Sequence, residues 1–203
     1  MSVPRSLQTV AAEAHDCTRC DLYRNATQTV FGEGPAHPHL FVIGEQPGDH
    51  EDVAGAPFVG PAGRVLDDAF EAASIDRGSV YVTNAVKHFK WTPRGKRRIH
   101  DRPNRTEIVA CHAWLATELE KVKPDVVVAL GAVAGQSLWG PSFRVGAAKG
   151  QLLDVDGRPA VATVHPSAIL RARDGDDRRA AMAGLVEDLQ RAATLRPTPA
   201  GKR

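Results

Sequence analysis

The sequence contains few cysteines, little net charge and no long apolar run. No segment approaches the roughly 20 apolar residues that span a bilayer, and no apolar run follows a basic patch at the N-terminus. We therefore expect a cytoplasmic protein without a membrane anchor. The formal net charge is +2 at pH 7, so the overall charge indicates no particular class of partner.

Cysteine is present at only three positions, and an odd number this small cannot build a disulfide framework. Two of the three, Cys17 and Cys20, form a CxxC pair. In a protein of the cell interior this spacing favours metal or redox chemistry. Cys111 by itself is typical of a buried core residue. The sequence therefore predicts a metal site near the N-terminus.

Positive charge is concentrated between Lys87 and Arg105, where Asp101 is the only acid. Trp91, Gly95 and two prolines interrupt this stretch, so we predict a loop that attracts phosphates. A solvated basic run without a partner is the alternative. The cations are Lys87, Lys90, Arg94, Lys96, Arg97, Arg98, Arg102 and Arg105.

Four short apolar runs predict buried strands, and helical patterns lie between them. One helical pattern starts at Pro61, and another follows Asn104 and Glu107, which resemble a capping pair. A hairpin through Asp156-Gly157 adds a further strand, and a last helix covers 177–193. The strand runs are 40–44, 80–83, 126–131 and 160–164.

Alternating strands and helices predict an α/β fold with a parallel sheet and helices on both sides. We expect residues 1–195 to form one domain, because 203 residues suffice for one core of this class. Residues 196–203 are rich in proline and charge and are predicted to be a disordered tail.

Polar residues follow three of the predicted strands at their carboxyl ends. They are the segment GEQPGDHED (44–52), Asn84, and His165-Pro166-Ser167. Ligands of open parallel sheets bind at this edge, so three polar segments that meet there favour a pocket. Each segment alone is equally typical of an ordinary turn or a hydrogen-bonded core histidine.

These residues strongly resemble the uracil-DNA glycosylase superfamily, in particular its iron-sulfur branch, family 4, and the cross-linking subgroup called UdgX. The resemblance runs from Cys17 to about Leu189 and rests on CTRCDLYR, GEQPGDHED, PFVGPAGRVLD, YVTNAVKHFK, GKRRIH, the helix that carries Cys111, and HPSAILR. It implies a three-layer α/β/α sandwich with a four-stranded parallel central sheet and a uracil pocket at the strand ends.

The resemblance also implies a 4Fe-4S cluster. Cys17, Cys20 and Cys111 match three of the family's four cysteine ligands, and His88 stands where family 4 has the fourth. Imidazole replaces thiolate in Rieske centres, so His88 is the expected fourth ligand. The cluster is expected to be structural, because breaking a glycosidic bond needs no redox step.

For the uracil pocket, the resemblance implies that Phe58 stacks on the base and Asn84 pairs with its edge. His165 is expected to stabilise negative charge on the departing uracil. Gln46 and Asp49 are expected to shape the pocket and hold the loop, with Gln46 contacting uracil; the alternative for Asp49 is to position a water molecule. Without the resemblance, core packing and strand capping explain Phe58 and Asn84 better.

The motif KRRIH carries the most specific expectation. In the subgroup that it resembles, its histidine, here His100, replaces water and bonds to the anomeric carbon of the sugar. A nucleophilic imidazole needs one free nitrogen and an acceptor for the other, and Glu45 is that partner by resemblance. The implied function is uracil excision followed by covalent trapping on the abasic site. The alternative is that His100 is one more phosphate contact.

Uracil-containing DNA is the expected partner, single-stranded and bound by a monomer near the nucleoid. Five residues are expected to contact phosphates, and Leu170 is expected to fill the space that a flipped base leaves. The five are Lys96, Arg97, Arg98, Ser167 and Arg171.

A multiple-turnover iron-sulfur glycosylase is the nearest alternative, because it shares every feature except His100. An iron-sulfur protein that only binds nucleic acid would leave GEQPGD, Asn84 and HPS without a role. A nucleotide-binding protein is disfavoured, since neither GxGxxG nor GxxxxGK follows the first strand.

Overall fold

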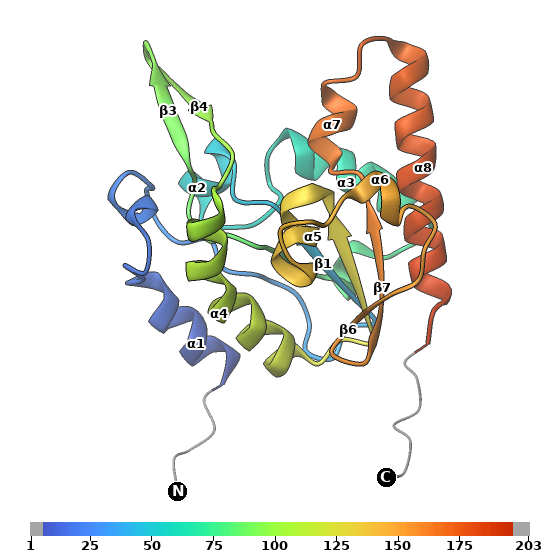
Figure 1. Cartoon of the computed structure of the whole chain (residues 1–203), viewed down its shortest axis with the longest axis horizontal. Helices are drawn as coiled ribbons and strands as arrows, with labels where there is room; N and C mark the ends of the chain where they lie inside the picture. Colours follow the sequence, from blue (N-terminus) through green and yellow to red (C-terminus); the bar gives the residue numbers. More distant parts are fainter. Residues whose placement is uncertain (1–5, 197–203) are drawn as a thin grey trace, which may run out of the picture.

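A five-stranded sheet forms the centre of the structure, a computed structural model that describes residues 6–196 (Figure 1). The order is β2-β1-β5-β7-β6, and the first four strands are parallel while β6 pairs antiparallel with β7. The predicted four-stranded parallel sheet with one added hairpin strand is therefore confirmed. The strands are β1 (Leu40–Gly44), β2 (Tyr81–Asn84), β5 (Val126–Leu130), β6 (Leu153–Val155) and β7 (Arg158–Thr163).

Helices cover both faces of the sheet and bury two separate apolar clusters. Along β1, Phe41 and Ile43 pack into the cluster under α1, α4 and α5, whereas Leu40 and Val42 pack into the cluster under α3 and α8. This alternation confirms the three-layer sandwich. The helices are α1 (Leu7–His15), α2 (Asp49–Ala54), α3 (Pro61–Ala72), α4 (Arg105–Val122), α5 (Gly131–Trp139), α6 (Val145–Ala148), α7 (Pro166–Leu170) and α8 (Gly175–Thr194), with short 3₁₀ helices at Asp21–Arg24 and Arg77–Ser79.

The predicted helix starts are correct because their capping chemistry is local. Pro61 occupies the first turn of α3. At the start of α4, the Asn104 side chain accepts from the Glu107 N–H, and the Glu107 carboxylate accepts from the Asn104 N–H.

A two-stranded antiparallel hairpin replaces most of the loop predicted between Lys87 and Arg105, so the loop assignment is wrong there. Its strands are β3 (Trp91–Arg94) and β4 (Arg97–His100), and it projects from the body of the molecule (Figure 1). Gly95 has φ +60°, which suits the first position of the two-residue turn. The hairpin buries too little apolar surface to show a strand pattern, and Pro93 within β3 also argues against a strand.

The helices of residues 6–196 include none long and apolar enough to cross a membrane. The predicted tail lies outside the described residues except for Arg196, whose guanidinium donates to the carbonyls of Ala193 and Leu195.

Candidate active site

The carboxyl ends of the parallel strands bring the predicted site residues to one edge of the sheet. Glu45 follows β1, Asn84 ends β2 and His165 follows β7, and the register pairs Gly44 with Asn84. The β3–β4 hairpin stands on one side of this edge, and α7 with the start of α8 stands on the other (Figure 1). The edge is therefore bounded by two projections.

Asn84 and Phe58 converge above Gly44. A Cβ added to Gly44 would lie 2.4 Å from Oδ1 of Asn84 and 2.6 Å from Cζ of Phe58, so only glycine allows both side chains to approach. Asn84 is buried, and no hydrogen bond within residues 6–196 engages its side-chain amide. Its donor and acceptor are available to a ligand.

Phe58 is held in a strained backbone conformation by the first turn of α3. Its φ is +58°, and a Cβ on Gly63 would lie 1.7 Å from the Phe58 carbonyl oxygen. Strain of this kind persists only where surrounding packing imposes it. The Phe58 ring lies 6.3 Å from the His165 ring with 29° between their planes. An aromatic face and an imidazole thus line the same edge.

His165 is fixed in one neutral tautomer. Its Nδ1 accepts a hydrogen bond from the Ser167 backbone N–H at 3.1 Å, so the ring proton lies on Nε2. Burial, with a smaller contribution from the charges of Arg171 and His100, lowers the pKa of His165 to about 4. The imidazole is therefore a neutral N–H donor at physiological pH.

His100 and Glu45 face each other across the gap between hairpin and sheet. The distance from His100 Nε2 to Glu45 Oε1 is 3.5 Å, and the His100 side chain is 49% exposed. Burial raises the pKa of Glu45, while the charges of His100, Arg102 and Arg171 oppose that rise. The carboxylate can hold one nitrogen of an imidazole that solvent still reaches.

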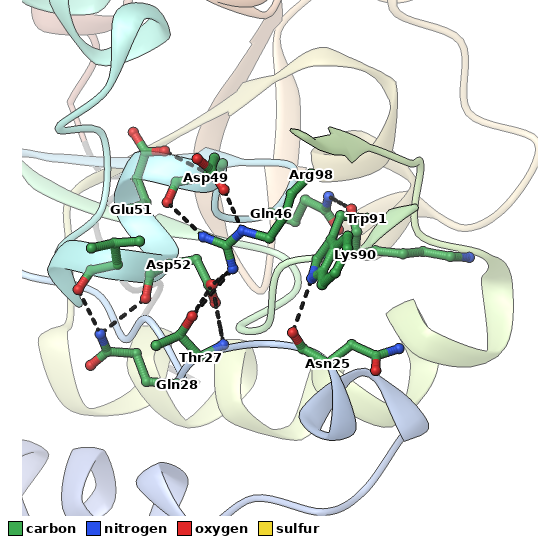
Figure 2. Close-up of polar contacts among 12 residues, drawn as sticks. Asn25, Thr27, Gln28, Gln46, Asp49, Glu51, Asp52, Lys90, Trp91 and Arg98 are labelled. Atoms are coloured by element: carbon green, nitrogen blue, oxygen red, sulfur yellow. Dashed lines mark hydrogen bonds and ion pairs between the residues drawn. The ribbon is translucent and has the colours of Figure 1, made fainter. Parts of the chain in front are cut away.

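Arg98 fastens the hairpin to α2 (Figure 2). Its Nε lies 2.5 Å from Asp49 Oδ1, and its Nη1 lies 2.5 Å from Oδ2 of the fully buried Asp52. Asp52 also accepts from the backbone N–H and hydroxyl of Thr27. Because the guanidinium of Arg98 is engaged by two carboxylates, its clearest role is to hold the loop; a phosphate contact for it stays a prediction.

Gln46 clamps the base of the hairpin. Its amide nitrogen donates to the carbonyls of Lys90 and Asp101, and its oxygen accepts from the Lys90 N–H, each at 3.1 Å. Trp91 adds a bond from Nε1 to the Asn25 carbonyl. His100 precedes Asp101, so these bonds also limit where His100 can move. Both amide hydrogens of Gln46 are used here, and its contact with uracil stays a prediction.

Two buried carboxylates of α2 were missed by sequence reasoning. Glu51 accepts from the N–H groups of Gly48 and Gly60 and so joins the loop after β1 to the loop before α3. Its spacing from Gly48 is a capping signal that the sequence does contain. Asp52 carries no local signal, because its partners Thr27 and Arg98 are distant in the chain.

Lys87 does not belong to the phosphate-attracting surface, which corrects the interpretation of the basic stretch. Its side chain is fully buried and forms an ion pair with the buried Glu118. Its Nζ also donates to the Thr83 hydroxyl and the Asn84 carbonyl. Lys87 therefore holds the carboxyl end of β2 in place through these hydrogen bonds.

The remaining predicted DNA contacts lie on the two projections. Lys96 and Arg97 are exposed at the hairpin turn, and Ser167 and Arg171 belong to α7 and its end. Leu170, also on α7, is 40% exposed. The structure thus separates these residues into two groups across the edge, and their contact with DNA stays a prediction.

The three free cysteines, candidate ligands of an iron-sulfur cluster, lie in the segment after α1 and in α4. Cys111 Sγ accepts from the Lys87 N–H and Cys17 Sγ accepts from Trp114 Nε1–H, contacts that favour thiolates. Burial, opposed by Lys87 and aided by the nearby Cys20 and Cys17, raises the pKa of Cys111 to about 11. The three thiols therefore lie within each other's electrostatic range.

No group of three or more Cys, His, Asp or Glu within residues 6–196 is arranged to hold a metal ion. A cluster spreads its ligands over several iron atoms, so a cluster held by the cysteines stays a prediction. His88 is buried, and burial lowers its pKa, but the charged group that acts on it is Asp52. The hydrogen bonds to sulfur thus favour Cys17 and Cys111 as ligands, and His88 stays a prediction.

Comparisons with known proteins identify the family of this chain. Residues 31–190 match the family model described as the uracil DNA glycosylase superfamily. The chain is 35% identical over 191 residues to a type-4 uracil-DNA glycosylase of Thermotoga maritima, covering 93% of this chain and 94% of that protein. Proteins of the same name from Archaeoglobus fulgidus (33% over 173 residues; 81% of this chain, 83% of that one) and Pyrobaculum aerophilum (35% over 166; 77% and 80%) are also similar. The chain therefore belongs to the uracil DNA glycosylase superfamily.

Proposed function

We propose that this protein excises uracil from DNA and that His100 then captures the sugar as a covalent adduct. Excision is supported by family membership and by relatives named uracil-DNA glycosylases. Capture is supported by one observation above the others: the 3.5 Å approach of His100 Nε2 to Glu45 Oε1 beside the pocket edge. The substrate class is uracil-containing DNA, and single strands spare the cost of flipping a paired base.

Base recognition falls to Asn84 and Phe58. The unengaged amide of Asn84 offers one donor and one acceptor to the edge of uracil, and the Phe58 ring offers a stacking face. Both are held tightly, Phe58 by α3 and the end of β2 by Lys87. A rigid pocket that stacks uracil closely excludes the methyl group of thymine.

His165 assists departure of the base. The glycosidic bond breaks with its electron pair moving onto uracil, and the Nε2–H of the neutral His165 donates to the oxygen where negative charge collects. The Ser167 N–H keeps the proton on Nε2, so the donor is oriented before the substrate binds. The sugar is left with positive charge at its anomeric carbon.

His100 supplies the electron pair that this carbon needs. The ring nitrogen that Glu45 does not engage forms the new bond, and the positive charge moves onto the imidazole. The proton on the other nitrogen is held by or passes to Glu45, whose raised pKa suits an acceptor. In a conventional glycosylase a water molecule takes the place of His100 and leaves a free abasic site.

A 4Fe-4S cluster completes the proposal, with Cys17, Cys20, Cys111 and His88 as ligands. It would tie the segment after α1 to α4 and to the end of β2, and it supplies no step of the reaction. The fit of the three cysteines supports it, as does the type-4 name of the relatives.

One gel tests the function. Purified protein is incubated with a uracil-containing oligonucleotide and then heated in detergent. A heat-stable shifted band, with the nucleotide fragment found on His100 by mass spectrometry, supports capture. Release of many uracils per chain without a shifted band shows a conventional glycosylase, and no release at all rejects the function.

A further inference from the structure

A cavity of about 520 Å³ lies beside the base of the hairpin, outside the residues assigned to the reaction. It is enclosed by the segment before α4, the first half of α4 and the end of α5, helices that lie next to each other in Figure 1. Its volume falls within the range of small-molecule sites. The residues used in the argument are Arg102, Arg105, Ile108, Val109, His112 and Leu138.

The lining combines positive charge with apolar surface. Arg102, Arg105 and His112 supply cationic or proton-donating groups, and the described lining includes no carboxylate. Glu107, in the first turn of α4, is already paired with Lys90, and Asp101 precedes Arg102 outside the lining. Such a field favours an anion, and phosphate is the anion that arginine binds best.

The apolar part of the cavity is also unusual for a surface. Val109 is a large apolar residue that is 63% exposed, and it lines the cavity together with Ile108 and Leu138. Cations next to an apolar wall match a nucleotide, which joins a charged phosphate to a flat base. A free inorganic anion would leave this wall without a partner.

Arg102 links the cavity to the neighbouring reaction site. Arg102 lines the cavity, and its charge also acts on Glu45, which faces His100. Gln46 holds Asp101, the residue between His100 and Arg102, in a fixed position. A strand whose sugar lies at His100 therefore has a neighbouring nucleotide within reach of Arg102.

We propose that this cavity binds a nucleotide that flanks the target uridine in the same DNA strand, with its phosphate at Arg102 and Arg105 and its base against Val109 and Leu138. The inference rests on the proposed function and extends it, because it gives the protein a strand subsite beyond the flipped base. The subsite makes activity depend on strand length on one side of uridine.

Single-stranded oligonucleotides of graded length provide the test. The shortest is deoxyuridine 3′,5′-bisphosphate, which has no nucleotide on either side, and longer ones add nucleotides on the 5′ side only or the 3′ side only. Uracil release is measured under subsaturating, single-turnover conditions. The wild-type rate should rise with extension on one side. Arg105→Glu and Val109→Asp should reduce that gain about fivefold to tenfold and leave the rate on the shortest substrate unchanged. Arg105→Glu should also lower the slope of log affinity against log salt concentration by about one.

Two control variants match these changes at residues outside the cavity lining. Arg158→Glu reverses a charge at the amino end of β7, and Leu152→Asp alters an apolar residue that is 59% exposed. Both should retain the length dependence. Equal length dependence in Arg105→Glu, Val109→Asp and wild type would overturn the subsite, as would an equal slowing of short and long substrates. Failure to release uracil from any oligonucleotide overturns the proposed function and the subsite with it.

Discussion

His100 and Glu45 come from different parts of the chain, yet His100 Nε2 lies 3.5 Å from Glu45 Oε1. Glu45 follows the central strand β1, whereas His100 ends the second strand of an exposed hairpin. The contact exists because Gln46 and Arg98 hold that hairpin against the body. A histidine that only met phosphate would need no carboxylate partner.

Replacement of His100 should change the outcome of the reaction. His100→Ala and His100→Ser are expected to lose the heat-stable adduct but still release uracil, because water can enter the vacated position and His165 still stabilises the leaving base. His165→Ala should slow both steps. Release and adduct are measured on the same samples. A His100→Ala variant that retains the adduct would falsify the capture mechanism, while mere weakening of DNA binding supports the phosphate-contact alternative.

The pH dependence of adduct formation should follow the protonation of the Glu45 carboxylate. Burial raises its pKa, so as pH falls the carboxylate gains a proton at a higher pH than an ordinary glutamate does. Adduct formation should decline with falling pH in that range, because a neutral acid stabilises the imidazolium less. Glu45→Gln should form adduct at least about tenfold more slowly and lack this pH dependence. Parallel pH profiles in both proteins would assign the titration to another group.

Asn84 should set the choice of base. Asn84→Asp presents two acceptor oxygens where the amide offered one donor and one acceptor. The preference for uracil over cytosine should fall, and hypoxanthine, xanthine and thymine should stay poor substrates. Excision rates on matched oligonucleotides with each base are the measurement. An unchanged preference for uracil over cytosine would show that another residue reads the base.

Arg97 and Arg98 are neighbours in the chain, but Arg97 is exposed and the Arg98 side chain is largely buried in ion pairs. Arg97→Ala is therefore a matched control for Arg98→Ala. Arg98→Ala leaves the buried Asp52 with only its Thr27 bonds and should cost about 1–3 kcal/mol of unfolding free energy. It should also slow adduct formation more than uracil release, since the hairpin loses its anchor. Arg97→Ala should leave stability unchanged and weaken DNA binding. Chemical denaturation measures stability, and the adduct gel measures adduct formation. Equal behaviour of the two variants contradicts the role of Arg98 as an anchor of the hairpin.

Purified protein should be brown and contain about four iron atoms per chain. Iron analysis and the visible absorption spectrum check this. His88→Cys should keep the cluster if ligation is the only role of His88, and Cys111→Ser should lose it. A colourless protein that folds fully without iron removes the cluster from the proposal.

Local patterns in the sequence determined much of the fold. The apolar runs at 40–44 and 126–131 predicted buried strands, and Pro61 and the Asn104–Glu107 pair marked helix starts, because burial and capping depend on residues that are close in the chain. The position of Asn84 at a strand end followed from the same patterns. The roles given to Phe58, His100 and Glu45 came instead from the resemblance of their motifs to the uracil-DNA glycosylase superfamily.

Only the tertiary structure decided which charges are exposed to solvent and which hold the protein together. Lys87, Arg97 and Arg98 look alike in the basic stretch, but Lys87 is buried against Glu118 and Arg98 binds Asp49 and Asp52, whereas Arg97 is exposed. The hairpin was missed because its strands carry no apolar alternation. Folding brings the partners of a charged side chain from distant segments of the sequence. The residues next to it in the chain therefore do not reveal whether it will be paired or exposed.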